Sequence, residues 1–530
     1  MNANFGIIAP LSVRVKGGKA ARSLFLAVML LLVSFVACKG DENKPQDKTE
    51  SNTSGVSDVS APDQSADTGS EEVSEDYVYG KDIPVKDLGG RVIRVLSINW
   101  AANSTSMTYN GDIIQRDTYD ELTADVLDRT KCEVRQNIET RYNCVIEGVF
   151  DSNNFASVIY NQVQAPSENS YDIVLNSFGG AAQATLTGVY VDMNDIPTLD
   201  LSNPWWDQNA VHDLSIGNRV YFTAGDINTF DNDGTFIMFF NKKVLEDNCP
   251  GVNLYDLVKN NEWTLDKMYE LAKMVTHESD GVNGLDEFDT WGFGTEVYNA
   301  LLHVIASGVH LAEKDADDIP VLSYDTARFY DVLTDVYAIY NDEGTVMVAN
   351  AGKFDSKYSN VWEATIIKAF REERELFYMG GMFNIVGFRD VEHIGYLPVP
   401  KYTADQERYY HFVSTGNASC LALPAVSDNY DDLGLVIEAL AAESKNLVTP
   451  VYYDKCLKGK DADTEDDEDM LDIIFESRCF DLGAIYNWGG IYSEIAKLRS
   501  DDMKSRFESI AGKIQDAMEA DIDTILMFDY

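Results

Sequence analysis

Two carboxylates, Asp226 and Asp231, lie in the polar segment Gly225-Asp-Ile-Asn-Thr-Phe-Asp-Asn-Asp233. Such carboxylates could serve either in acid–base catalysis or in ligand binding. A pair of carboxyl groups across a sugar bond is what a glycosidase needs for acid–base work. Carboxylates also accept hydrogen bonds from sugar hydroxyls without turnover, and Asn228 adds an amide to the same segment. Asn and Asp are frequent in ordinary turns, which is the structural alternative.

Motifs for other kinds of catalysis are missing from the chain. It contains no HExxH, GxSxG or Walker sequence, and Gly292-Phe-Gly294 lacks the third glycine of a dinucleotide loop. His303 and His310 are two helical turns apart, a poor spacing for two ligands of one metal. We therefore expect no cofactor and no catalytic metal.

An acidic segment at 280–289 resembles a degraded calcium loop. Such a loop needs oxygen ligands at alternating positions and a final bidentate acid. Here alternate positions fall on glycine, and the last position falls on Thr290. We predict a plain surface turn and no metal, and we interpret the acidic run at 461–469 as a solvated loop.

Aromatic residues beside glycine-containing segments are the other candidates for ligand contact. A sugar ring packs its C–H faces on flat rings while its hydroxyls bond carboxylates and amides. The candidates are Trp100, Trp291, Trp362, Tyr486 and Trp488, of which two or three are expected to face a ligand. The adjacent pair Trp205 and Trp206 predicts a surface lid or a packing corner.

The elements that must position these side chains begin with a parallel sheet. Buried-type apolar runs at 92–98, 144–146 and 171–175 alternate with amphipathic helical patterns at 119–138 and 155–163. This βαβαβ order predicts parallel strands with right-handed crossovers. Ligands of such sheets bind at the carboxyl ends of the strands, where Asn99, Trp100, Asn176 and Ser177 follow.

The first 84 residues predict export and tethering. Four basic residues precede an apolar run at 23–36, and Ala37-Cys38 resembles a lipoprotein cleavage site, although Phe35 departs from the aliphatic residue usual there. We expect a signal peptide at 1–37, lipidation of Cys38, and a disordered acidic tether at 38–84. An ordinary signal peptide with a chance cysteine is the alternative.

Charge and length narrow the classes of partner. The 530 residues carry 42 Lys plus Arg against 88 Asp plus Glu, a formal charge of -46. Nucleic acid and anionic lipid would be repelled by such a surface. The length favours two domains, and the six cysteines besides Cys38 permit either disulfides or buried thiols.

The order of several segments is similar to that of the family 1 extracellular solute-binding proteins of bacterial ABC importers, the group of maltose-binding protein. The matching segments are Tyr171-Asp-Ile-Val174, 188–193, Gly225-Asp226, Phe240-Asn241-Lys242, 253–257 with Trp263-Thr264, 377–382, Ile394-Gly-Tyr-Leu-Pro-Val-Pro400 and Gly416-Asn-Ala-Ser419. The resemblance covers residue 85 to the C-terminus.

The resemblance implies an α/β fold of two lobes, the type II fold of periplasmic binding proteins, with a ligand cleft between them. Lobe 1 would comprise 85–228 and 417–470, and lobe 2 would comprise 234–412 and 475–530, joined by three crossings. Gly225, Gly234 and Gly416 could give the crossings backbone freedom, although glycine is more frequent in ordinary turns.

The function implied is capture without turnover. We expect a monomeric, lipid-anchored receptor on the extracellular face of the cell membrane that binds a sugar or oligosaccharide and delivers it to ABC permease subunits, with no cofactor. The alternatives are an exported carbohydrate-active enzyme and a surface adhesin or sensor subunit. The predicted ligand-binding residues are Asn99, Trp100, Ser177, Asp226, Asn228, Asp231, Trp291, Trp362, Tyr486 and Trp488.

Overall fold

The computed structural model describes residues 79–98, 112, 126–151, 155–167, 169–388, 391–426, 429–453, 465–499 and 502–528. Cys38, Asn99 and Trp100 lie outside these residues, so their predicted roles stay predictions. Residues 74–530 form one unit, and residues 1–73, which form another, are not among those described.

The first sheet has the strand order β2-β1-β3-β13-β4. Its strands are β1 (Arg91–Ile98), β2 (Cys144–Asp151), β3 (Ile173–Ser177), β13 (Ser419–Ala422) and β4 (Phe222–Thr223). The first three are parallel, and β13 runs antiparallel to β3 and β4. The crossover helices are α2 (Val126–Tyr142) and α3 (Phe155–Gln164), so the βαβαβ prediction is confirmed.

The second sheet has the order β11-β5-β10-β6-β9. Its strands are β5 (Phe236–Asn241), β6 (Trp291–Thr295), β9 (Val346–Val348), β10 (Glu375–Gly381) and β11 (Ile394–Leu397). Strand β5 is antiparallel to β10 and β11, whereas β10, β6 and β9 are parallel. The Asn241 side chain caps the next helix, α7 (Lys242–Asn248), by accepting from the Val244 N–H at 2.9 Å.

The remaining helices cover these sheets. They are α4 (Phe178–Thr185), α5 (Gln208–Leu214), α6 (Phe230–Asp233), α8 (Leu254–Lys259), α9 (Leu265–Val275), α10 (Ala300–Ala306), α11 (Ala327–Tyr340), α12 (Lys368–Arg371), α13 (Asn384–Gly387), α14 (Tyr430–Val451), α15 (Glu465–Glu476), α16 (Leu482–Ile485), α17 (Ile491–Ile495) and α18 (Met503–Leu526). Short elements are η2 (Met193–Asp195), η3 (Val297–Asn299), η4 (Gly352–Phe354), the π-helix η5 (Glu363–Ile367), η7 (Trp488–Gly490) and the hairpin β7 (Ala312–Lys314) and β8 (Pro320–Leu322).

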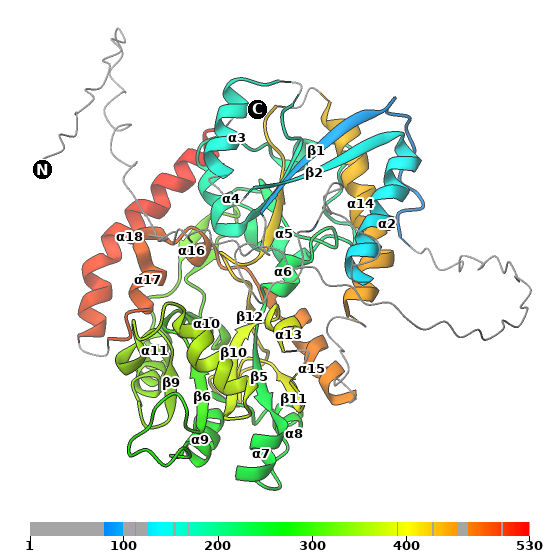
Figure 1. Ribbon diagram of the computed structural model, residues 1–530. Coiled ribbons are helices and arrows are strands. Elements are labelled where there is room, and N and C mark those ends of the chain that lie inside the picture. The colour runs from blue at the N-terminus through cyan, green and yellow to red at the C-terminus, as the bar shows by residue number, and fades with distance from the viewer. Residues whose placement is uncertain are drawn as a thin grey trace, which may run out of the picture. The chain divides into compact units, whose positions relative to one another are not determined.

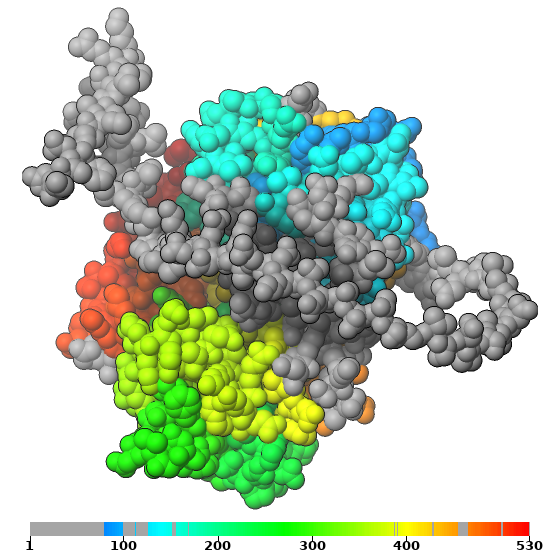
Figure 2. All heavy atoms as spheres, viewed as in Figure 1, coloured from blue at the N-terminus to red at the C-terminus, as the bar shows by residue number. Residues whose placement is uncertain are grey.

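The two sheets lie in separate lobes, the blue-cyan and the green-yellow parts of Figures 1 and 2. Three chain segments run side by side between them. Strands β12 (His411–Phe412) and β14 (Arg478–Cys479) pair in parallel, and Thr235, just before β5, bridges Val413. These segments are crossings of the kind that the resemblance implies.

The structure moves one predicted lobe boundary. Helix α14 packs on α2 beside the first sheet, but α15 packs on β11 of the second sheet. Lys242 pairs with Asp467 of α15 at 2.8 Å, and Tyr255 bonds the same carboxylate. Residues 465–470, which the expected boundary puts in lobe 1, thus contact the second sheet through α15.

The described cysteines are thiols. Cys132, Cys144, Cys249, Cys420 and Cys479 are all free and buried, which favours the second of the two alternatives for them. Within the described part of the chain, no helix combines the length and apolar character that a membrane span requires.

The acidic segment at 280–289 uses its carboxylates within the protein. Asp289 is fully buried and accepts backbone N–H groups from Ser279 at 2.7 Å, Asp280 at 3.3 Å and Asp286 at 2.8 Å. Lys357 and Tyr358 bond the buried Glu287. Burial raises the pKa of Asp289, but its backbone hydrogen bonds outweigh that effect and leave the pKa below its ordinary value.

Replacing Asp289 should destabilise the fold and alter its acid sensitivity. Asp289→Ala leaves three amides without their acceptor, which should cost about 1–3 kcal/mol in a urea titration at pH 7. Because the folded-state pKa is lowered, the carboxylate stabilises the protein above the unfolded pKa of about 3.9, and this contribution is lost as pH falls through the folded value. The gap between wild type and Asp289→Ala should thus shrink below pH 4, and a constant gap would contradict this account.

Candidate functional site

The carboxyl end of β6 carries a carboxyl group with an unusual environment. Glu296 follows β6 directly and is half-buried, and its carboxyl group has no hydrogen-bond partner among the described residues. Burial raises its pKa to about 7. Burial also raises the pKa of Tyr378 and of Tyr492, and the nearby Glu296 charge adds to both effects. A half-buried carboxyl group with a pKa this perturbed is a candidate for ligand contact.

An exposed aromatic ring lies two residues further on. Tyr298 is 54% exposed, and its ring centroid lies 6.3 Å from that of Tyr492 in an edge-to-face arrangement. The segment is fixed locally, because the Val297 N–H donates to Asn350 Oδ1 at 2.9 Å. The edge of the second sheet therefore carries one carboxyl group and, two residues later, one exposed aromatic side chain.

Helices α16 and α17 connect this edge to the first sheet. Helix α17, which carries Tyr492, contacts η3 and α10, whereas α16 contacts α4. Helix α4 starts where β3 ends, and Ser177 caps it by accepting from the Gly180 N–H at 3.2 Å. The predicted site residue Ser177 is thus at the expected sheet edge, with its hydroxyl engaged in the helix cap.

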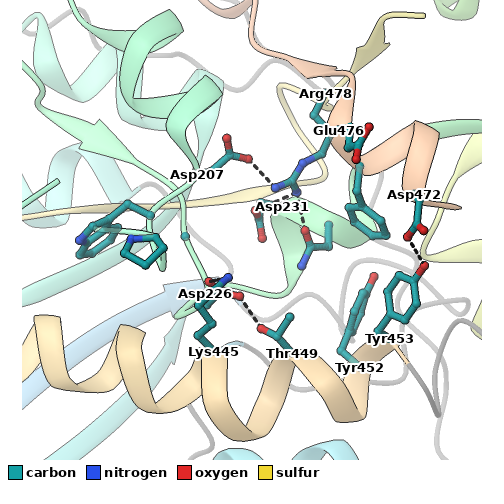
Figure 3. A pocket seen from close by; sticks show the side chains of 15 residues that line it. Asp207, Asp226, Asp231, Lys445, Thr449, Tyr452, Tyr453, Asp472, Glu476 and Arg478 are labelled. Carbon is teal, nitrogen blue, oxygen red and sulfur yellow. Dashed lines mark hydrogen bonds and ion pairs between the residues drawn. The ribbon is translucent and has the colours of Figure 1, made fainter. Parts of the chain in front are cut away.

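Asp226 and Asp231 line a different feature, a cavity of about 330 Å³ between α14 and α15 (Figure 3). Its lining consists of Pro204, Trp206, Asp207, Gly225, Asp226, Asp231, Asn232, Lys445, Thr449, Tyr452, Tyr453, Asp472, Phe475, Glu476 and Arg478. We call it the α14–α15 cavity. It brings together two of the predicted carboxylates with side chains from both lobes.

Ion pairs organise the wall of this cavity. Arg478 on β14 pairs with Asp207, the cap of α5, and with Asp231 at 3.2 Å, and it donates to Asn232. Asp226 pairs with Lys445 at 3.2 Å and accepts from Thr449. Burial raises the pKa of both Asp226 and Asp231, while Lys445 and Arg478 respectively oppose that rise.

Trp206 reaches the cavity because of a glycine and a buried acid. A Cβ on Gly225 would lie 2.8 Å from Trp206 Cε3 and 2.5 Å from the Trp205 carbonyl oxygen. The indole N–H groups of Trp205 and Trp206 donate to the buried Glu438 at 2.6 and 3.1 Å. Both rings are buried, which makes this pair a packing corner, one of its two predicted roles.

Solved structures share this architecture. A cyclo/maltodextrin-binding protein complexed with maltotetraose matches with 12% identity over 84% of this chain and 100% of its own, at a TM-score of 0.50. A sugar transporter from Rhizobium etli in an open conformation is 12% identical over 83% of this chain and 100% of its own, at a TM-score of 0.50. UspC from M. tuberculosis is 14% identical over 81% of this chain and 100% of its own, also at a TM-score of 0.50. The chain has the two-lobed fold of bacterial solute-binding proteins.

No protein-family model matches the sequence, and no curated protein matches it either. The similarity to these solved structures is therefore seen in the fold and in the order of the segments, whereas the sequence identity is too low for a sequence-based match. The α/β fold class predicted from that order is confirmed.

Within the two-lobed fold, three predicted aromatic contacts are placed in the core. Trp291 is fully buried and donates its indole N–H to the Asp286 carbonyl oxygen at 2.7 Å. Trp488 is 1% exposed and donates to Asp521 at 3.0 Å, and the buried Tyr486 stacks on it at 5.3 Å. All three residues are buried and therefore offer little surface to a ligand.

The other predicted residues have mixed placements. Trp362 is half-buried and donates its indole N–H to Tyr378 at 3.3 Å, near the Glu296 edge. Asn228 is buried and donates to Ser419 at 3.1 Å, while Asp112 accepts from the adjacent Thr229 N–H at 2.6 Å. Asn228 therefore belongs to the packing at the start of the crossing, away from the α14–α15 cavity lining.

Among the described residues, no group of three His, Cys, Asp or Glu side chains is placed to hold a metal ion. His303 is buried without a hydrogen-bond partner, and burial lowers its pKa to about 3, so it is neutral. His310 instead lies 3.6 Å from Asp481. The two histidines are in separate environments, as their spacing predicts.

Sequence reasoning missed Glu296, Tyr298 and Arg478. The first two stand directly after the strand Trp291–Thr295, so applying the carboxyl-edge rule to the second sheet as well as the first would have found them. Arg478 had no such signal, because only the pairing of β12 with β14 brings it to the acidic loop.

Proposed function

We propose that this protein is an extracellular, lipid-anchored receptor of an ABC importer that captures a sugar or oligosaccharide between its lobes. The observation that carries the proposal is the partnerless Glu296 carboxyl group beside the exposed Tyr298 ring at the edge of the second sheet. Tyr298 supplies a flat apolar face for the C–H groups of a sugar ring, and Glu296 accepts hydrogen bonds from its hydroxyls.

Binding in this place would be coupled to lobe movement. Helix α16 contacts α4 of the first lobe and α17 contacts η3 beside Glu296, so a solute that moves α17 could act on both lobes. A ligand that contacts both lobes favours the closed arrangement. Delivery to permease subunits and anchoring through Cys38 are also part of the proposal, and the basic start, apolar run and Ala37-Cys38 pattern support the anchor.

Capture without turnover is the better proposal than hydrolysis. The fold is shared with proteins named for binding or transport of sugars. The two carboxylates that the sequence suggests for acid–base work are ion-paired instead, Asp226 with Lys445 and Asp231 with Arg478. Both pairs lie in the wall of the α14–α15 cavity, away from Glu296. We therefore propose that the protein is not an enzyme.

Substitutions at the sheet edge should weaken sugar binding. After a thermal-shift screen of sugars, in which ligand at a hundred times its Kd stabilises by about 2.7 kcal/mol, calorimetry would give the affinities of variants. Glu296→Gln should weaken binding by about ten- to a hundredfold, since hydrogen bonds to a charged group contribute about 1.5–3 kcal/mol. Tyr298→Ala should weaken it by about tenfold.

The pH dependence gives a further check on Glu296. Its pKa of about 7 means that the carboxylate becomes the dominant form above neutrality, so sugar affinity should rise between pH 6 and 8 in the wild type and stay flat in Glu296→Gln. The matched control is Tyr160→Ala, which removes an exposed tyrosine from α3. An equal loss in this control, or no response to any sugar, would refute the proposed site.

A further inference from the structure

The α14–α15 cavity is a second candidate site, separate from the Glu296 edge. One wall comes from the C-terminal end of α14, with Lys445 and Thr449, and the opposite wall from α15, with Asp472 and Glu476 (Figure 3). Helix α14 packs in the first lobe and α15 in the second. A molecule in this cavity would therefore touch both lobes beside the crossings.

The charge of the lining is negative. Five carboxyl groups line the cavity, on Asp207, Asp226, Asp231, Asp472 and Glu476, against two cationic side chains. Both cations are already paired, Lys445 with Asp226 and Arg478 with Asp207 and Asp231. Glu476 is exposed and has no ion pair among the described residues. The excess of negative charge favours a cationic ligand.

Asp231 shows an unmet hydrogen-bonding capacity in this wall. Asp231 is 1% exposed. Its Oδ2 atom pairs with Arg478 at 3.2 Å, whereas its Oδ1 atom has no hydrogen-bond partner. A buried carboxylate oxygen without a donor is costly, so such atoms usually have a partner. An N–H donor from a ligand in the cavity would satisfy it.

Aromatic rings form the apolar part of the lining. They belong to Trp206, Tyr452, Tyr453 and Phe475. The hydroxyl of Tyr452 donates to Asp233 at 2.7 Å and that of Tyr453 donates to Asp472, so the rings are held in place by carboxylates. Ring faces attract ammonium groups and pack against methylene chains.

We propose that the α14–α15 cavity binds a linear diamine or polyamine. One ammonium group bonds Asp231 and Asp226 on the first-lobe side, the other bonds Asp472 and Glu476 on α15, and the methylene chain between them packs on the aromatic rings. The volume of about 330 Å³ corresponds to about eleven water molecules at about 30 Å³ each, enough for a chain of roughly ten non-hydrogen atoms. This proposal does not depend on sugar binding at Glu296.

Calorimetry with putrescine and spermidine, using the full chain, tests the proposal. Removing both α15 carboxylates in Asp472→Asn/Glu476→Gln should weaken amine binding at least tenfold, because one ammonium loses its partners. The matched control is Glu262→Gln, which removes an exposed carboxylate from another surface. It should change the affinity less than twofold at 150 mM salt, where distant surface charges are screened.

Several results would overturn the proposal. No binding of either amine to the wild type would do so, and so would equal weakening in the control, since the amine would then be held by overall charge alone. If the double variant lost sugar binding while Tyr298→Ala kept it, the cavity would be the sugar site and the amine proposal would fail. Loss of sugar binding in Tyr298→Ala with amine binding intact would support two separate sites.

Discussion

Arg478→Ala should lower the stability of the protein more than Asp289→Ala does. The side chain is 11% exposed and pairs with Asp207 and Asp231, which are 7% and 2% exposed. Removing one partner of a buried ion pair leaves an uncompensated charge and costs about 3–5 kcal/mol. Urea unfolding at pH 7 should show a free energy of unfolding that is lower by this amount, without loss of the folded baseline signal.

Two comparison variants separate charge from geometry in this network. Arg478→Lys keeps the charge but lacks the planar fork that reaches Asp207, Asp231 and Asn232 together, so it should fall between wild type and Arg478→Ala. Arg129→Ala removes an exposed arginine from α2 and should shift stability by less than about 0.5 kcal/mol. A small effect of Arg478→Ala, similar to that of Arg129→Ala, would show that the network does not stabilise the fold.

The fold was more predictable from the sequence than the site. Hydrophobic runs such as 92–98 and 171–175 give the strands directly, because a strand buried on both faces leaves little freedom in residue type. The Asn241 cap follows from a local rule that needs no tertiary information. Both are features that a few neighbouring residues determine.

The aromatic contacts were less predictable because burial depends on the whole fold. Trp488 follows a glycine-rich pattern typical of a loop, yet its ring packs against α18 and its N–H bonds Asp521, 33 residues later. Tyr298 has no more distinctive neighbours, but its ring is exposed at a sheet edge. Sequence gives the residue type and its approximate position on a strand, whereas long-range packing decides which ring faces solvent.

The crossings show a similar division between local and long-range causes. Gly225, Gly234 and Gly416 were predicted to give backbone freedom, but none of them has a positive φ. A Cβ on Gly225 would meet the Trp205 and Trp206 backbone and ring, and a Cβ on Gly234 would meet Ala418 and Asn417. Two of the three glycines are therefore required for close approach between segments, which a single sequence does not show.

Gly234→Ala should consequently disturb the crossings, whereas Gly416→Ala should not. Gly234 ends α6 with φ −78° and ψ −3°, values open to any residue, so only the lack of space opposes a side chain. Its new Cβ would lie 2.8 Å from the Asn417 carbonyl oxygen and closer still to the Ala418 methyl group. Overpacking of this kind costs about 1–3 kcal/mol. It would push apart the two segments that lead into β5 and into β13.

Gly416 lies in the neighbouring crossing with no atom within 4 Å of its would-be Cβ, which makes it a matched control. Gly416→Ala should change the unfolding midpoint little or raise it slightly, since alanine reduces the entropy of the unfolded chain. Because the crossings connect the two lobes, Gly234→Ala should also change the affinity for whichever sugar the screen identifies, while Gly416→Ala should leave it within twofold. Equal behaviour of the two variants in both measurements would mean that the close approach at Gly234 has no role in holding the lobes.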